Sequence, residues 1–111
     1  MTEKKIREVL DKFAEEAKKI YGTKLESLIL YGSCARGDFE NDSDIDILIL
    51  LDAPLETINS ERKRILDVSD KLDLDYDVVL APVVQNYALY QKYIPVSVFY
   101  QNVEKEGVKI A

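Results

Sequence analysis

The chain has 111 residues, of which 47% are hydrophobic, and this length and composition suit one compact domain. Its 15 basic and 21 acidic side chains give a net charge of −6, which disfavours nonspecific binding to nucleic acid. With one cysteine and no histidine, an intramolecular disulfide and a histidine-containing zinc site are both excluded. The opening residues are charged and no apolar run reaches about 18 residues, so we expect a cytoplasmic protein with no signal peptide and no membrane contact.

The first half of the chain predicts one helix and two strands. Apolar residues recur every three or four positions over residues 3–21, which is typical of an amphipathic helix that Gly22 would end. Residues 25–31 form a short apolar run and predict a buried strand. After turn-forming residues at 38–43, an isoleucine-rich run at 44–51 predicts a second strand.

The second half is expected to contain a helix, a strand and a terminal helix. Apolar residues among charges at 55–71 favour a helix, and the alternation of apolar and acidic residues at 72–80 indicates a third strand. Residues 83–91 fit either a short helix or a loop. A terminal helix is expected at 95–106, with proline near its start and Gly107 just past its end. This order predicts an α/β (α+β) fold, in which helices cover one face of a small mixed sheet and leave the other face for chemistry.

The first candidate functional feature is the turn at Gly32 and Ser33, directly after the first predicted strand. Backbone amides at the start of a helical turn lack intrahelical partners and can bind phosphate. Gly32 allows a ligand to approach the backbone, and the Ser33 hydroxyl can add a hydrogen bond to the phosphate oxygens. Taken alone, a glycine-serine pair after a strand is more often an ordinary turn.

A pair of acids, Asp44 and Asp46, opens the second predicted strand. Residues two apart in a strand share a face, with Cα atoms about 6–7 Å apart. Two like charges repel unless a cation lies between them, and oxygen ligands suit Mg²⁺ or Mn²⁺. The alternative is a solvated strand start, but the apolar run at 47–51 indicates a central buried strand whose first residues reach the rim of the sheet.

A third acid is expected on the neighbouring strand. We favour Asp77 because it directly precedes the apolar run at 78–80, as Asp46 precedes its own apolar run. Asp75 is the second choice and Asp73 is less favoured. The alternative is that all three form a solvated acidic edge.

Arg36 has two possible roles. Its guanidinium can contact phosphate, or it can form an ion pair with Asp38 or Asp42 that fixes the turn. The structural role is slightly favoured.

The pattern Gly32-Ser33-x-Ala35-Arg36-Gly37, followed by Ser43-Asp44-x-Asp46-Ile47, resembles the signature of the minimal nucleotidyltransferases, which are small members of the DNA polymerase β-like superfamily. The likeness covers residues 25–51 directly, and the order of helices and the ending at 102–107 extend it over nearly the whole chain. It implies a nucleotidyltransferase fold over residues 1–111 as one domain, with ATP as the nucleotide donor. The site residues that it implies are Gly32, Ser33, Arg36 and Ser43 for the nucleotide, and Asp44, Asp46 and Asp77 as catalytic ligands of two Mg²⁺ ions.

The resemblance also implies an activity and a partner. Stand-alone chains of this length resemble antitoxins paired with a HEPN-domain ribonuclease toxin, which they inactivate by transferring AMP from ATP to a tyrosine hydroxyl. On this reading Asp77 could accept the proton of the attacking hydroxyl. A nucleic acid is not expected as the acceptor, because the chain is acidic and has no further domain to hold one. Two alternatives are a non-catalytic antitoxin or nucleotide-binding subunit that acts by binding, and an adenylyltransferase for small molecules.

Aromatic residues gather late in the chain, where they could form either a partner surface or part of the core. They are Tyr76, Tyr87, Tyr90, Tyr93, Phe99 and Tyr100.

Overall fold

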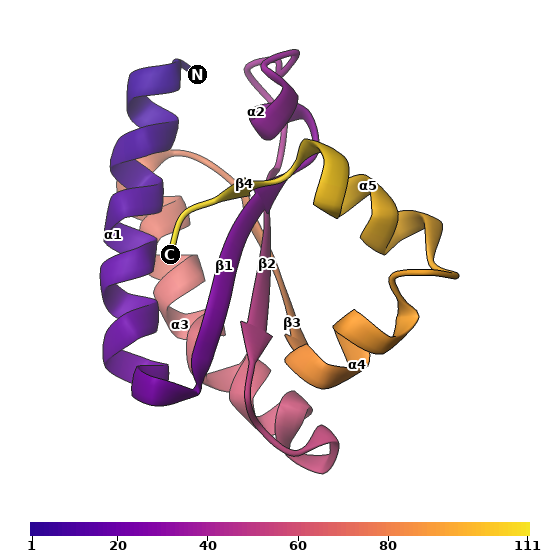
Figure 1. The fold of residues 1–111 in the computed structure, drawn as a ribbon. Helices are drawn as coiled ribbons and strands as arrows, with labels where there is room; N and C mark the ends of the chain where they lie inside the picture. Colours follow the sequence, from indigo (N-terminus) through magenta and orange to yellow (C-terminus); the bar gives the residue numbers. More distant parts are fainter.

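The computed structural model describes residues 1–111 as a four-stranded sheet with helices on both sides (Figure 1). The elements in chain order are α1 (Glu3–Tyr21), β1 (Leu25–Tyr31), α2 (Ser33–Arg36), β2 (Ile45–Leu51), α3 (Ile58–Tyr76), β3 (Leu80–Asn86), α4 (Tyr87–Tyr93), α5 (Val98–Glu106) and β4 (Val108–Lys109). Short 3-10 turns precede β1 and α3. No helix has the length and apolar character that crossing a bilayer requires.

The sheet has the strand order β3-β2-β1-β4 and is mixed. β1 pairs antiparallel with both β2 and β4, whereas β2 and β3 are parallel. A parallel pair needs a crossover, and α3 supplies it. The expected fold class, a small mixed sheet combined with helices, is therefore confirmed.

Strand β2 is buried on both faces. Its odd-numbered residues belong to the main core with α1 and α3, while Leu48 and Leu50 pack with Tyr90 of α4 and Val103 of α5. The expectation that helices cover one face only is wrong, because these two short helices cover part of the other face (Figure 1). A run of consecutive apolar residues, as at 47–51, is typical of a strand that is covered on both faces.

The structure confirms the predicted first helix and the first two predicted strands. The Thr2 hydroxyl accepts a hydrogen bond from the Lys5 amide at 3.1 Å and caps the start of α1. Gly22, at φ 55°, follows its last residue. β1 has the predicted bounds, and β2 begins one residue later than predicted, at Ile45.

The predicted strand at 72–80 is wrong, because its first residues continue α3 to Tyr76. The buried positions Ile65, Ser69 and Leu72 follow helical spacing, whereas Leu74 is 86% exposed, so the apparent alternation is not a burial pattern. Asp77 ends the helix in the left-handed region (φ 54°), and β3 starts only at Leu80.

Two other boundaries differ from the sequence prediction. The ambiguous segment 83–91 contains the end of β3 and most of α4. The terminal helix begins at Val98, three residues later than expected, because the Ser97 hydroxyl accepts a hydrogen bond from the Tyr100 amide at 3.1 Å and caps it there. Gly107 follows its last residue, as predicted.

We predict that Leu48→Ala lowers the free energy of unfolding by about 2–5 kcal/mol, because Leu48 is fully buried under α4 and α5. Leu74→Ala removes the same atoms from an exposed position and should change stability by less than about 0.5 kcal/mol. Urea unfolding of both variants measures the difference. Equal effects would show that α4 and α5 do not bury Leu48 in solution.

Candidate active site

The turn after β1 is held between two glycines with positive φ. Gly32 has φ 76° and Gly37 has φ 90°, and the four residues between them form α2. The Gly32 carbonyl accepts hydrogen bonds from the amides of Ala35 and Arg36, each at 3.1 Å. The amides of Ser33 and Cys34 precede these bonds, so they are the groups that such a turn offers to a ligand.

Asp46 lies directly against this turn. A Cβ atom at position 32 would collide with Oδ2 of the Asp46 carboxylate, so a residue larger than glycine would have to displace that side chain. The antiparallel register pairs Tyr31 with Asp46, which brings the end of β1 and the start of β2 side by side. The structure therefore brings together the predicted turn and one of its predicted acids.

Asp44 is exposed and directly precedes β2, two residues before the half-buried Asp46. Its backbone carbonyl accepts a hydrogen bond from the buried Cys34 thiol, with 3.6 Å between sulfur and oxygen. This bond ties α2 to the chain just before β2. Sequence reasoning gave Cys34 no role of this kind.

The two acids repel each other. Burial raises the pKa of Asp46 above its ordinary value, and the negative charge of Asp44 raises it further, while Arg36 acts in the opposite direction. Burial also raises the pKa of Tyr31, with a further contribution from the charge of Asp46. The site thus holds negative charge that a bound cation would stabilise.

Arg36 forms two ion pairs, one within the turn region and one that connects it to α5. Its Nε lies 3.2 Å from Asp38 Oδ2, and its Nη1 lies 3.2 Å from Glu106 Oε2. Of the two aspartates considered from the sequence, Asp38 is the partner. The contact with Glu106 joins residues 70 positions apart in the chain, and sequence reasoning missed it.

The Ser43 hydroxyl oxygen accepts a hydrogen bond from the Glu40 amide at 2.8 Å. This bond closes the loop that leads into β2. The hydroxyl hydrogen of Ser43 is not used in that bond and can still be donated.

The structure does not bring a third acid into the pair. No three acidic or thiol side chains are arranged so that they could hold a metal ion. Asp77 is exposed at the end of α3, and Asp75 lines a different hollow between α3 and α1.

Among the acids of α3, Asp73 has a pKa that responds to the charge of Asp44. Burial is the largest cause of its raised pKa, and its Oδ1 accepts a hydrogen bond from the Leu80 amide at 2.8 Å. Sequence reasoning placed all three acids on one strand and ranked Asp73 last, because it lies farthest from the apolar run at 78–80.

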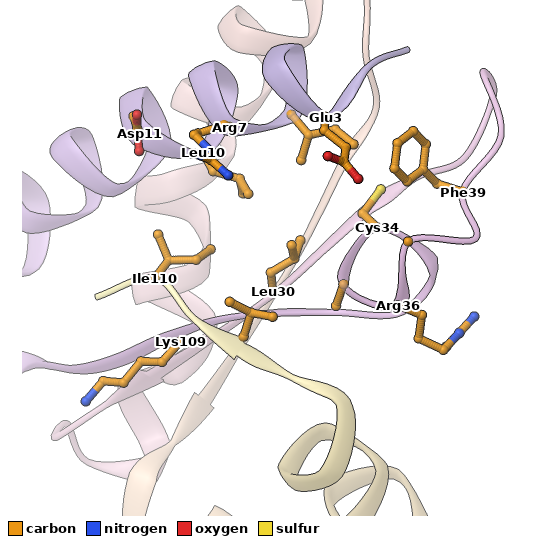
Figure 2. A pocket seen from close by; sticks show the side chains of 14 residues that line it. Glu3, Arg7, Leu10, Asp11, Leu30, Cys34, Arg36, Phe39, Lys109 and Ile110 are labelled. Atoms are coloured by element: carbon orange, nitrogen blue, oxygen red, sulfur yellow. The ribbon is translucent and has the colours of Figure 1, made fainter.

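A cavity of about 530 Å³ borders the turn on the side of α1, where Cys34, Ala35, Arg36 and Gly37 line it, but it does not reach the two acids. Figure 2 shows Glu3, Arg7 and Leu10 of α1 on one side of it and Leu30 and Ile110 on the other. Gly32, Ser33, Asp44 and Asp46 do not line it. A smaller cavity of about 180 Å³ does border Gly32, on the side of α5.

A glycine-bounded turn beside two acids, at the start of the central strand of a mixed sheet, is the arrangement expected from the resemblance to nucleotidyltransferases. The chain belongs to the nucleotidyltransferase domain family, whose model matches residues 10–110. The enzyme class expected from the motif is thereby confirmed.

Two similar proteins agree with this assignment, and one solved structure shares the fold. The chain is 34% identical over 105 residues to a candidate protein adenylyltransferase of Methanocaldococcus jannaschii, MJ0141, covering 95% of this chain and 98% of that protein. It is 38% identical over 105 residues to MJ0604, another candidate protein adenylyltransferase of the same organism, covering 95% and 93%. A crystal structure of a toxin-antitoxin with AMP-PNP has the same fold, with a TM-score of 0.59 and 22% identity over all of this chain and 73% of that chain.

We predict that Gly32→Ala abolishes nucleotidyl transfer, because the added methyl group displaces the Asp46 carboxylate. The matched control is Gly37→Ala, which also places alanine at positive φ but meets no atom within 4 Å. Backbone strain should cost Gly37→Ala about 1–2 kcal/mol of stability. It should cost Gly32→Ala about 1–3 kcal/mol, because Gly32 has a ψ of −157° and lies outside the left-handed helical region. If the control is equally inactive, strain in the turn rather than displacement of Asp46 explains the loss.

We predict that Asp46→Asn makes the metal-free protein more stable at neutral pH. The pKa of Asp46 is raised in the folded state, so its ionised form destabilises the fold once the pH exceeds its ordinary value of 3.8. Below that value the carboxyl group is neutral in both states, and the variant and wild type should converge. Thermal unfolding with a chelator at pH 7 and at about pH 3 measures this. A variant that is less stable at pH 7 would contradict the prediction.

Proposed function

We propose that this chain transfers AMP from ATP to a tyrosine hydroxyl of a HEPN-domain toxin, in a reaction that depends on Mg²⁺, and thereby acts as its antitoxin. The observation that carries the proposal is the Asp46 carboxylate packed against Gly32, with Asp44 close enough to perturb it. The two candidate protein adenylyltransferases matched over nearly their whole length support protein as the acceptor. The neighbour that contains a toxin-antitoxin with AMP-PNP supports the toxin context, and the motif resemblance supports the HEPN partner.

The acids present suit magnesium. Mg²⁺ is commonly held by one or two carboxylates together with the phosphates of its substrate. Asp44 and Asp46 supply the two carboxylates, and their mutual repulsion favours a cation between them. When bound, Mg²⁺ stabilises the charge that develops on the attacking and leaving oxygens.

The residues of the chain then have distinct roles. The amides at Ser33 and Cys34 and the Ser33 hydroxyl bind the phosphates that leave as pyrophosphate. Asp44 and Asp46 would hold the Mg²⁺ that positions the α-phosphate. The acceptor oxygen then bonds to the α-phosphorus as the bond from that phosphorus to the bridging β-phosphate oxygen breaks. A third acid would accept the proton of the acceptor hydroxyl. The sequence favours Asp77, and Asp73 is the acid of α3 whose pKa is raised in part by the charge of Asp44.

The late aromatic residues divide between the two roles expected of them. Tyr90 is buried and Tyr76, Tyr87 and Tyr100 are half-buried, so these contribute to packing. Tyr93 and Phe99 are exposed, together with Val96 and Val98. Of these, Tyr93, Val96 and Val98 form an exposed apolar surface on and before α5 that is available to the toxin.

We predict that Asp44→Asn and Asp46→Asn each abolish labelling of the toxin by α-³²P-ATP in the presence of Mg²⁺. Asp52→Asn is the matched control, because it removes the same charge from an exposed residue that follows the far end of β2. Label on the toxin in both site variants would refute the assignment of the acids. A tight complex with wild-type protein but no label would instead support inhibition by binding alone, and label on an added small hydroxyl compound would favour the small-molecule alternative.

The same assay identifies the third acid. Asn substitutions at Asp73, Asp75 and Asp77 change one carboxylate each, and the variant that loses the most transfer identifies the group. Loss at Asp77 alone would support the choice from sequence. Asp73→Asn also alters the hydrogen bond from the Leu80 amide, so its stability is measured by urea unfolding. Loss of transfer in this variant would identify Asp73 only if the variant is still folded under the assay conditions.

A further inference from the structure

The cavity beside Gly32 adjoins the residues proposed to bind the phosphates and the metal, but Ser33, Asp44 and Asp46 do not line it. It has a volume of about 180 Å³, and its lining residues are Tyr31, Gly32, Arg36, Phe99, Asn102, Val103 and Glu106. Gly32 lines the cavity and also lies against the Asp46 carboxylate, so the cavity is adjacent to the proposed metal-binding acids. β1 and α2 form one wall, and α5 forms the other.

Phe99 is an exposed but fixed aromatic ring in this cavity. It is 43% exposed, yet its ring centroid lies 5.3 Å from that of Tyr31 at an interplanar angle of 77°. The ring of Tyr100 also lies close, with a centroid distance of 5.6 Å. A large ring kept in place at the surface beside a reaction centre is suited to stacking on a planar ligand.

The polar groups of the cavity favour a neutral ligand over an anion. Arg36 is the cation in the lining, and it is already paired with Asp38 and Glu106. An additional phosphate would therefore find no free positive charge there. Asn102 lies three residues after Phe99 on the same face of α5, and its exposed amide can both donate and accept hydrogen bonds.

We infer that this cavity binds the purine base of the nucleotide donor, with Phe99 as its stacking platform and Asn102 as its hydrogen-bonding partner. The inference rests on the proposed function, because it locates the base of the same triphosphate whose phosphates lie on the turn at Gly32 and Ser33. Amide side chains match the donor and acceptor pattern of adenine. Stacking supplies affinity for any base, and Asn102 supplies the preference among bases.

Calorimetric titration of the whole chain with ATP, GTP and tripolyphosphate, each with Mg²⁺, tests this inference. Phe99→Ala should weaken ATP binding by roughly tenfold, the loss that removing one stacking partner produces, and leave tripolyphosphate binding unchanged. Val98→Ala removes apolar surface from the preceding, 71% exposed position of α5 and should alter neither. Asn102→Ala should reduce the difference in affinity between ATP and GTP.

Two results would overturn the inference while leaving the proposed function intact. One is unchanged ATP affinity in Phe99→Ala, including the case in which only transfer to the toxin is lost, since the cavity would then serve the acceptor. The other is an equal loss of ATP and tripolyphosphate binding, since Phe99 would then only support the fold. If the wild-type chain binds neither ATP nor tripolyphosphate, the proposed function itself fails.

Discussion

The contact between the backbone of Gly32 and the carboxylate of Asp46 is the constraint on which the site depends. It exists because β1 and β2 are antiparallel neighbours, with Tyr31 opposite Asp46. A glycine at φ 76° lets the turn begin directly over that acid without displacing its carboxylate. Any shift of β2 relative to β1 would separate the turn from the acid.

The buried strand β2 resists such a shift. A one-residue slip would exchange the residues that face α1 and α3 for those that face α4 and α5. Both sets are apolar, but the slip would also move Asp46 to the other face, into the main core, where an ionised carboxylate is costly. The packing of β2 therefore keeps two repelling acids and a glycine with positive φ close together, although their own interactions are unfavourable. Local strain and like charges of this kind are characteristic of functional sites.

The first half of the fold could be predicted from sequence because its signals are local. The apolar run at 47–51, the turn formers before it and the glycine-serine pair each specify their own conformation and, together, the place of Asp44 and Asp46. The end of α3 could not be predicted in this way, because Leu72, Leu74 and Tyr76 alternate with acids as a strand would. The competing helical stripe was hidden by polar members, Ser69 and the buried Glu61, which forms ion pairs with Lys24 and Arg64. The Arg36–Glu106 pair joins distant segments and left no local signal.

The free edge of β3 limits how a partner protein can approach the acids. The Val79 carbonyl accepts a hydrogen bond from the Ile45 amide. The backbone N–H and C=O groups of odd-numbered residues along β3 therefore point toward β2, and those of even-numbered residues point toward the free edge. The outward amides are largely unavailable: that of Leu80 donates to Asp73, that of Asn86 donates to the Gln85 side chain, and Pro82 has none. Addition of a partner strand is therefore disfavoured at this edge. A partner protein would instead have to use side chains, of which Val79 and Val83 are exposed along β3 and Val98 is exposed on α5.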